Sequence, residues 1–277
     1  MIDQSQTDKF KDILELSQNI LLIFPETKDL DLFLATYCFY SFFLPKKSIR
    51  ILSPKFTQKI PKELEKLIKF DEVENELGKE NLIISFPYQE EQVDKVSYYI
   101  GAKDKRFYLT IKPKKNISPL ESTKVEFSYA GAQADLLVLC GVENLENLQQ
   151  LYFAYETLYK GDNNYVVTIN NFIPDFGKLN LDISPSSSYS EAIFYLLQDL
   201  DSKNEDILAK SNLPSLLLYG IEAKTKGLQS EEVDINTFLA VASLLKLGAT
   251  RLFKLETQKS VKKKPINKVK VQNRLTK

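Results

Sequence analysis

The residues whose types and spacing could carry out chemistry in this chain are carboxylates, because its 277 residues include no histidine. Serine–histidine triads, cysteine–histidine dyads, histidine proton shuttles and imidazole metal ligands are therefore excluded. Asp29 and Asp31 stand close together after an apolar run. Because hard cations accept carboxylates plus several waters, this pair could hold one weakly bound Mg²⁺. The alternative is a helix N-terminal turn, where aspartates are favoured electrostatically without any ligand.

A run of three serines is the second candidate site. Ser186, Ser187 and Ser188 precede a helical pattern, and their hydroxyls and backbone N–H groups could bind a phosphate. The alternative is helix capping alone, since Ser188 and Glu191 fit a Ser-x-x-Glu capping box. The two interpretations are compatible.

The third candidate is the basic C-terminal tail. From Leu252 onward the chain has nine basic residues and one acidic residue, a charge of +8, and because the whole chain is neutral the remainder carries −8. Lys262, Lys263 and Lys264 lie at the centre of this tail and could contact the phosphates of RNA or a nucleotide. The alternative is a disordered, solubilising tail.

Short β-rich runs that alternate with helical patterns must position these residues. They predict an α/β fold, a mostly parallel sheet flanked by helices in a Rossmann-like arrangement. The expected strands are residues 19–24, 48–52, 81–86, 135–140 and 165–169. Apolar residues at helical spacing predict buried helix faces in the segments 30–41, 145–159, 192–200 and 238–245.

An antiparallel insertion is expected at about residues 90–130. Residues 96–100 and 106–111 flank a Gly-containing loop and predict a hairpin. The aromatic residues of this hairpin alternate along the strands and so fall on both faces, which leaves some exposed and able to form a partner surface.

Two further properties concern the cellular context. Cys38 and Cys140 each lie in an apolar run, which predicts two buried free thiols and a reducing compartment. The sequence shows no membrane-spanning stretch and no secretory hydrophobic segment at its N-terminus, so we expect a cytoplasmic protein with no membrane partner.

Four short motifs follow in order along the second half of the chain: Phe-Gly-Lys-Leu-Asn at 176–180, the serine run, Leu-Tyr-Gly-Ile at 218–221 and Leu-Lys-Leu-Gly-Ala at 245–249. With their spacing, residues 15–251 resemble the DHH phosphoesterase family, which includes nanoRNA-degrading enzymes and phosphoadenosine phosphate phosphatases. The resemblance implies a DHH-type domain at 1–251 and a flexible basic tail at 252–277.

The resemblance also implies a site for two divalent metals, usually Mn²⁺, held by histidines and aspartates. The family's first motif is His-x-x-x-Asp-x-Asp, in which Asp29 and Asp31 match both aspartates but Pro25 replaces the histidine. The ligand aspartate of the second motif corresponds to Gly141, or to Cys140 in the adjacent register. Since proline and glycine offer no side-chain ligand, this pattern predicts a dismantled metal site.

The later motifs are altered as well. The Asp-His-His motif of the family corresponds to Asn170 and Asn171 or their neighbours, and a later aspartate corresponds to Lys224, with the following Thr225 retained. In the family geometry Lys224 would face the first-motif aspartates, where its ammonium could take the place of the missing cation. The alternative is a lysine in solvent at a helix end.

Three functional hypotheses follow from the resemblance. The first is a non-catalytic protein that binds a nucleotide, RNA or a protein through the former cleft or the tail. The second is a residual Mn²⁺- or Mg²⁺-dependent phosphoesterase that uses Asp29 and Asp31 on short oligonucleotides or pAp. The third is an assembly subunit, either a homo-oligomer or a partner of an intact relative. The family's second domain, with its glycine-rich motif, has no counterpart here.

Overall fold

A parallel six-stranded sheet forms the centre of the molecule, with the strand order β10-β9-β8-β1-β2-β3. This α/β architecture confirms the predicted fold class. The strands are β1 (Asn19–Ile23), β2 (Ser48–Leu52), β3 (Val73–Glu74), β8 (Leu136–Cys140), β9 (Tyr165–Asn170) and β10 (Leu179–Asp182). The computed structural model describes residues 2–56, 59–78, 81–87, 92–102, 104–118, 121–130, 134–161, 164–200, 208–209 and 211–254.

The two central strands, β1 from Ile20 onward and β8, are apolar without interruption because both faces of the sheet are covered there. In β1, Ile20 and Leu22 pack into one core while Leu21 and Ile23 pack into the other, as the two-residue period of a strand requires. All four side chains are at most 2% exposed.

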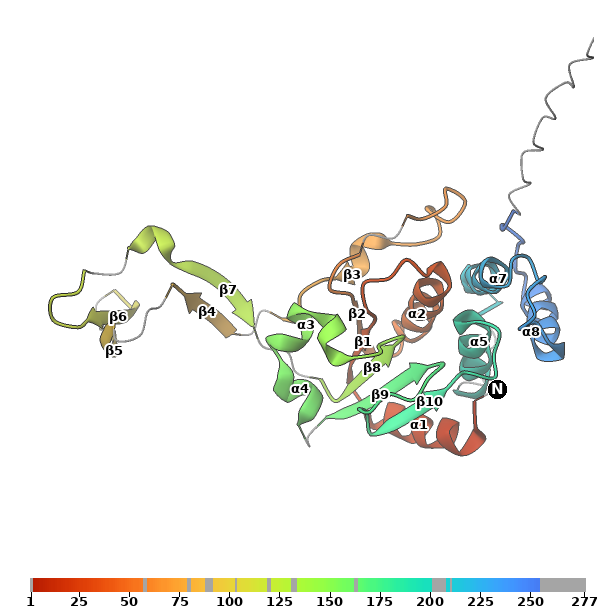
Figure 1. Ribbon diagram of the computed structural model, residues 1–277, viewed down its shortest axis with the longest axis horizontal. Coiled ribbons are helices and arrows are strands. Elements are labelled where there is room, and N and C mark those ends of the chain that lie inside the picture. The colour runs from red at the N-terminus through yellow and green to blue at the C-terminus, as the bar shows by residue number, and fades with distance from the viewer. Residues whose placement is uncertain are drawn as a thin grey trace, which may run out of the picture.

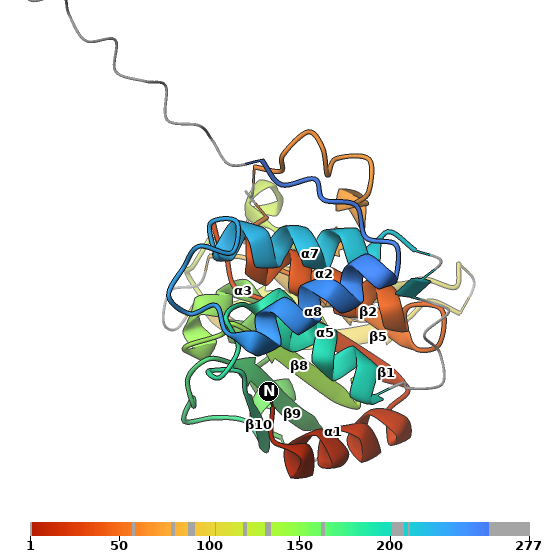
Figure 2. The same cartoon turned by 90° about the vertical axis from the view of Figure 1, so that its right-hand side faces the viewer.

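Helices cover the two faces unequally (Figure 1). The larger core lies under α1 (Gln4–Leu16), α2 (Leu30–Phe43), α5 (Tyr189–Leu200), α7 (Leu213–Lys224) and α8 (Ile235–Lys246). The smaller core lies under the 3₁₀ helix η3 (Leu145–Leu148), α3 (Gln150–Phe153) and α4 (Glu156–Lys160). Two further 3₁₀ turns are η1 (Phe70–Glu72) and η2 (Ser122–Lys124). Figure 2 shows α5, α7 and α8 packed side by side.

Two predicted helix faces need correction. Residues 145–159 do not form one helix, because the chain breaks at Gln149, whose φ is +48°. Tyr152 and Tyr159 are nevertheless buried. In α8 the predicted core residues Phe238 and Leu239 are 54% and 55% exposed, and the helix instead buries the adjacent face that includes Leu244. Helical periodicity alone did not identify which side of α8 meets α5 and α7.

The antiparallel insertion is longer than predicted. β4 (Asn81–Ser85) pairs with β7 (Glu126–Ala130), so the strand expected at 81–86 lies outside the parallel sheet, and the insertion begins near residue 81 rather than 90. β5 (Val93–Ile100) pairs with β6 (Phe107–Pro113), which confirms the hairpin. Together the two ribbons form an arm that extends away from the body (Figure 1).

The globular body continues past residue 251. Leu252 and Phe253 are partly buried against the core, and the Phe253 ring lies edge-on to Tyr219 at 5.5 Å. Arg251 forms an ion pair with the fully buried Glu222. The tail lysines 262–264 lie outside the described residues.

Both cysteines are buried free thiols, as predicted. Among the residues that the structure describes, none belongs to a helix long and apolar enough to cross a membrane.

Candidate functional site

The order in which the chain adds strands to the sheet places the candidate site at the carboxyl ends of the central strands. From β1 the chain proceeds to β2 and β3, and it later runs from β8 to β9 and β10 on the other side of β1. In open α/β sheets ligands bind at the carboxyl ends of the strands where this reversal occurs. Here that point lies between β1 and β8.

A cavity of about 590 Å³ is found at this point. Its lining includes Pro25 after β1, Gly141 after β8 and Phe172 after β9, so it brings together two positions where the resemblance expects metal ligands. The charged residues of the lining are Glu26, Lys28, Glu143 and Glu146. The excess of carboxylates makes this cavity electrostatically unfavourable for a phosphate group.

Asp29 caps the helix that follows β1. One carboxylate oxygen accepts hydrogen bonds from the backbone N–H groups of Asp31 at 3.0 Å and Leu32 at 3.4 Å, and the Asp29 N–H donates to Thr27 Oγ1 at 2.9 Å. This is the capping role that a helix N-terminus favours. The second oxygen remains available for a partner.

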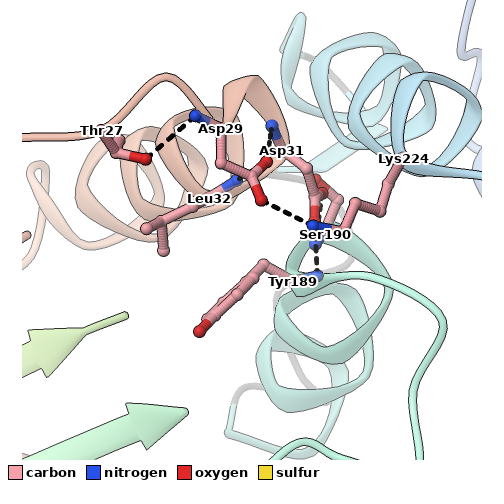
Figure 3. Close-up of polar contacts among 7 residues, drawn as sticks. All are labelled: Thr27, Asp29, Asp31, Leu32, Tyr189, Ser190 and Lys224. Carbon is pink, nitrogen blue, oxygen red and sulfur yellow. Dashed lines mark hydrogen bonds and ion pairs between the residues drawn. The ribbon is translucent and has the colours of Figure 1, made fainter. Parts of the chain in front are cut away.

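Lys224 supplies that partner. Its Nζ lies 2.6 Å from Asp29 Oδ2 (Figure 3), so the ion pair that the resemblance suggested as one of two alternatives is present with Asp29. Burial opposes the charge, but the hydrogen bond to Asp29 and the charges of Asp29 and Asp31 outweigh it and raise the pKa of Lys224. The two side chains are 45% and 33% exposed, so the pair contributes at most about 1 kcal/mol to stability.

Asp31 faces a different direction and is almost completely buried. Its carboxylate accepts hydrogen bonds from the backbone N–H groups of Tyr189 at 2.7 Å and Ser190 at 2.9 Å, the first residues of α5 (Figure 3). Burial raises the pKa of Asp31 to about 7; hydrogen bonds from Ser190 and Tyr189 act against this rise, and the charge of Asp29 adds to it. Asp31 therefore joins α2 to α5.

The residue that allows this junction is Gly220, for which the sequence pattern predicted no role. A Cβ at Gly220 in α7 would lie 2.0 Å from Ser190 Oγ and 3.0 Å from Asp31 Oδ1. Gly220 thus permits α7 to pack directly against the Asp31 junction. The Leu-Tyr-Gly-Ile motif contained the signal, since a glycine within a helix requires a packing reason.

The serine run caps α5. Ser188 Oγ accepts the Glu191 N–H at 3.0 Å, while the Glu191 carboxylate accepts hydrogen bonds from the Ser187 N–H and hydroxyl. The capping interpretation is therefore correct, although Glu191 reaches Ser187 rather than the N-cap backbone. Because Asp31 and Ser188 accept the N–H groups of residues 189–191, the first turn of α5 has no donor left for a phosphate. The Ser186 hydroxyl has no hydrogen-bond partner among the described residues, so phosphate binding by the hydroxyls of this run stays a prediction.

Glu191 is a second residue that sequence analysis did not place in the core. Only 1% of it is exposed, and it also accepts a hydrogen bond from the Thr237 hydroxyl at 2.8 Å. This contact links the α5 cap to the first turn of α8, which a short-range capping pattern could not reveal.

The remaining predicted site residues are structural or lie at the surface. Asn170 is buried and its amide donates to the Val142 carbonyl at 3.1 Å, whereas Asn171 is exposed. Thr225 donates its hydroxyl to the Ile221 carbonyl at 2.6 Å at the end of α7.

Gly141 cannot be exchanged for an aspartate without rearrangement. Its φ is +66°, and an added Cβ would lie 2.4 Å from Leu32 Cδ2. The space that a side chain at position 141 would need is thus filled by the Leu32 side chain of α2.

These residues do not fit a two-metal centre. Such a centre needs many anionic or imidazole ligands, but here Asp29 is paired with Lys224 and Asp31 is bonded to α5, while Pro25 and Gly141 supply no donor. Within the described ranges, no group of three or more His, Cys, Asp or Glu side chains is arranged to hold a metal.

The fold is similar to that of an exopolyphosphatase-related protein from Bacteroides fragilis, with a TM-score of 0.58 and 13% sequence identity. The match covers 90% of this chain and 58% of the relative, so the chain spans less than three fifths of that relative's length. At this identity the likeness establishes the fold and not an activity. No protein-family model and no curated protein matches the sequence.

Proposed function

We propose that this chain is a non-catalytic relative of the DHH phosphoesterases that binds a partner without hydrolysing it. The observation that carries the proposal is the Lys224–Asp29 ion pair, which places an ammonium beside a carboxylate that the family uses for a metal. A bound cation and a nearby ammonium compete for the same carboxylate charge, so the pair lowers the affinity of Asp29 for a dication.

The state of Asp31 supports the same conclusion. Its side chain is almost completely buried among the helices, and burial raises its pKa. Its oxygens are also engaged by the first turn of α5. Binding a metal through Asp31 would break the junction between α2 and α5.

The negative charge of the cavity disfavours binding of a nucleic acid or nucleotide there. Because Glu26, Glu143 and Glu146 outnumber Lys28 in the lining, phosphates are repelled there. We therefore assign any RNA binding to the basic tail, where Lys262, Lys263 and Lys264 are consecutive.

The test is an activity assay of the full chain with Mn²⁺ or Mg²⁺ against pAp, short RNA oligonucleotides and inorganic polyphosphate. Polyphosphate is included because the structural relative is named an exopolyphosphatase-related protein. We expect no turnover above that of Asp29→Ala and Asp31→Ala variants. Metal-dependent turnover that both substitutions abolish would establish the alternative, a residual phosphoesterase.

A further inference from the structure

The β5–β6 ribbon of the arm has one face that is apolar over three cross-strand pairs. The register pairs Val96 with Ile111, Tyr98 with Leu109 and Ile100 with Phe107, and these three pairs alternate with the remaining pairs along the ribbon. All six side chains of these three pairs are aliphatic or aromatic, and beyond them the register shifts between Val93 and Lys95. Five of them are 43–70% exposed: Val96, Tyr98, Ile100, Phe107 and Leu109.

An isolated two-stranded ribbon of this kind needs a covering partner. Two strands alone are marginally stable in water, and additional strands or a packed layer are normally required. Yet in the described part of the chain Tyr98 and Phe107 contact each other, with ring centroids 5.3 Å apart, and stay 68% and 63% exposed. A surface this apolar marks a protein-binding site.

The opposite face of the ribbon indicates what kind of partner fits. It carries the pairs Lys95–Lys112, Ser97–Thr110 and Tyr99–Tyr108, so the lysines lie on the side away from the apolar pairs. A nucleic acid stacked on Tyr98 and Phe107 would need cations on the same side as these rings. The separation of charge from the apolar face favours a protein.

We propose that the apolar face of β5–β6 is the interface of a homodimer, in which two copies of this ribbon pack face to face. These three pairs contain no charged residue, so two copies can meet without burying like charges, and of the two lysines on the opposite face Lys112 is paired with Asp94. Two-fold symmetry requires such a self-complementary patch.

The area is sufficient for this occupant. Six apolar side chains at roughly 100 Å² each on both copies would bury about 1,200 Å² in total, the lower end of the range for specific interfaces. Homodimer interfaces are also richer in apolar surface than transient ones.

The test compares two matched double variants of the full chain by sedimentation velocity. Tyr98→Thr/Phe107→Thr removes aromatic rings from the apolar face, and Tyr99→Thr/Tyr108→Thr removes them from the opposite face, with the strand-favouring residue threonine in both. We expect a dimer for the wild type and for the second variant, and a dissociation constant raised about 100-fold or more for the first. A wild type that stays monomeric at about 100 µM, or equal dissociation constants for both variants, contradicts the proposal.

A cross-linking experiment provides a readout that does not depend on weakening the ribbon. Leu109→Cys places a thiol near the middle of the apolar face, whereas Thr110→Cys places one on the opposite face. The native Cys38 and Cys140 are buried and do not interfere. Under mild oxidation we expect a disulfide-linked dimer from Leu109→Cys only. Binding of the monomeric wild type to lipid vesicles or RNA through this face would overturn the choice of a second copy.

Discussion

Asp29 and Asp31 are two residues apart, yet their surroundings give them different chemistry. Asp29 is partly exposed and shares its charge with Lys224 and the N-terminus of α2. Asp31 is buried and is surrounded by the first turn of α5. In each case the carboxylate is already bound by another part of the protein, Asp29 by an ammonium and Asp31 by two backbone N–H groups.

The buried Asp31 predicts a pH dependence of stability. Its pKa rises from 3.8 to about 7 on folding, so between these values the folded state binds more protons than the unfolded state. The contribution of the Asp31 pKa shift to the free energy of unfolding is fully present below pH 3.8 and is lost as the pH rises through 7. We therefore expect the unfolding free energy of the wild type, relative to Asp31→Asn, to decrease by at most about 4 kcal/mol between pH 4 and 7. Chemical denaturation of both proteins across this range measures it, and a difference that grows with pH contradicts the assignment.

Reversing the charge at Lys224 tests its role as a cation substitute. In Lys224→Asp a third carboxylate joins Asp29 and Asp31, so we expect the free energy of unfolding to fall by about 1 to 2 kcal/mol when no metal is added. Mn²⁺ should then raise the melting temperature of this variant while leaving the wild type unchanged. Lys226→Asp is the control, because Lys226 is exposed and lies just beyond the helix. Equal stabilisation of wild type and Lys224→Asp by Mn²⁺ would exclude the proposed substitution.

At the scale of elements, the site depends on three helices that meet at one point. Asp31 in α2 bonds to the start of α5, and Gly220 in α7 lies against both Asp31 and Ser190. The close approach exists because Gly220 has no side chain. This junction helps to fix the relative positions of the three helices.

Gly220→Ala should therefore destabilise the protein by about 1 to 3 kcal/mol, because the new methyl group overlaps Ser190 Oγ. Adding Ser190→Gly removes the side chain that the new methyl group overlaps. The double variant should therefore lose less stability than the sum of the losses in the two single variants. Thermal unfolding of the four proteins completes this cycle. Strict additivity would show that the overlap is relieved elsewhere.

A second element-scale contact anchors the end of the described chain. Arg251 follows α8 and pairs with Glu222 of α7, whose side chain is fully buried. Arg251→Met leaves that carboxylate without its cation, and because the Arg251 side chain is 58% exposed we expect the free energy of unfolding to fall by about 1 to 3 kcal/mol. The double variant Glu222→Gln/Arg251→Met should regain part of the stability that Arg251→Met loses, because no charge is then buried. Urea titration distinguishes the two variants, and an equal loss in both would assign the effect to packing.

At the scale of the whole molecule, charge is divided between an acidic body and a basic tail. If the tail binds RNA, replacing Lys262, Lys263 and Lys264 with alanine should weaken binding and reduce the slope of log affinity against log salt by about 2. Fluorescence anisotropy with a single-stranded oligonucleotide measures both. Unchanged binding, or binding that does not respond to salt, argues against the tail.

The sequence by itself determined the α/β class and the loss of histidine chemistry. A strand buried on both faces, such as β8, is apolar throughout, and the absence of histidine from the composition is independent of the fold. Local patterns also located the Ser188 cap and the β5–β6 hairpin, because both depend on residues a few positions apart.

Only the tertiary structure decided how distant residues meet. The contact of Asp31 with Ser190 joins residues 159 positions apart, which no local period encodes, and only the folded chain decided between an ion pair of Lys224 with Asp29 and a lysine in solvent. The exposed side of α8 and the pairing of β4 with β7 were mispredicted for the same reason, since burial depends on which neighbour each face meets. Asp29 and Asp31 matched a metal motif in sequence, but the folded chain directs one to an ammonium and the other to a helix.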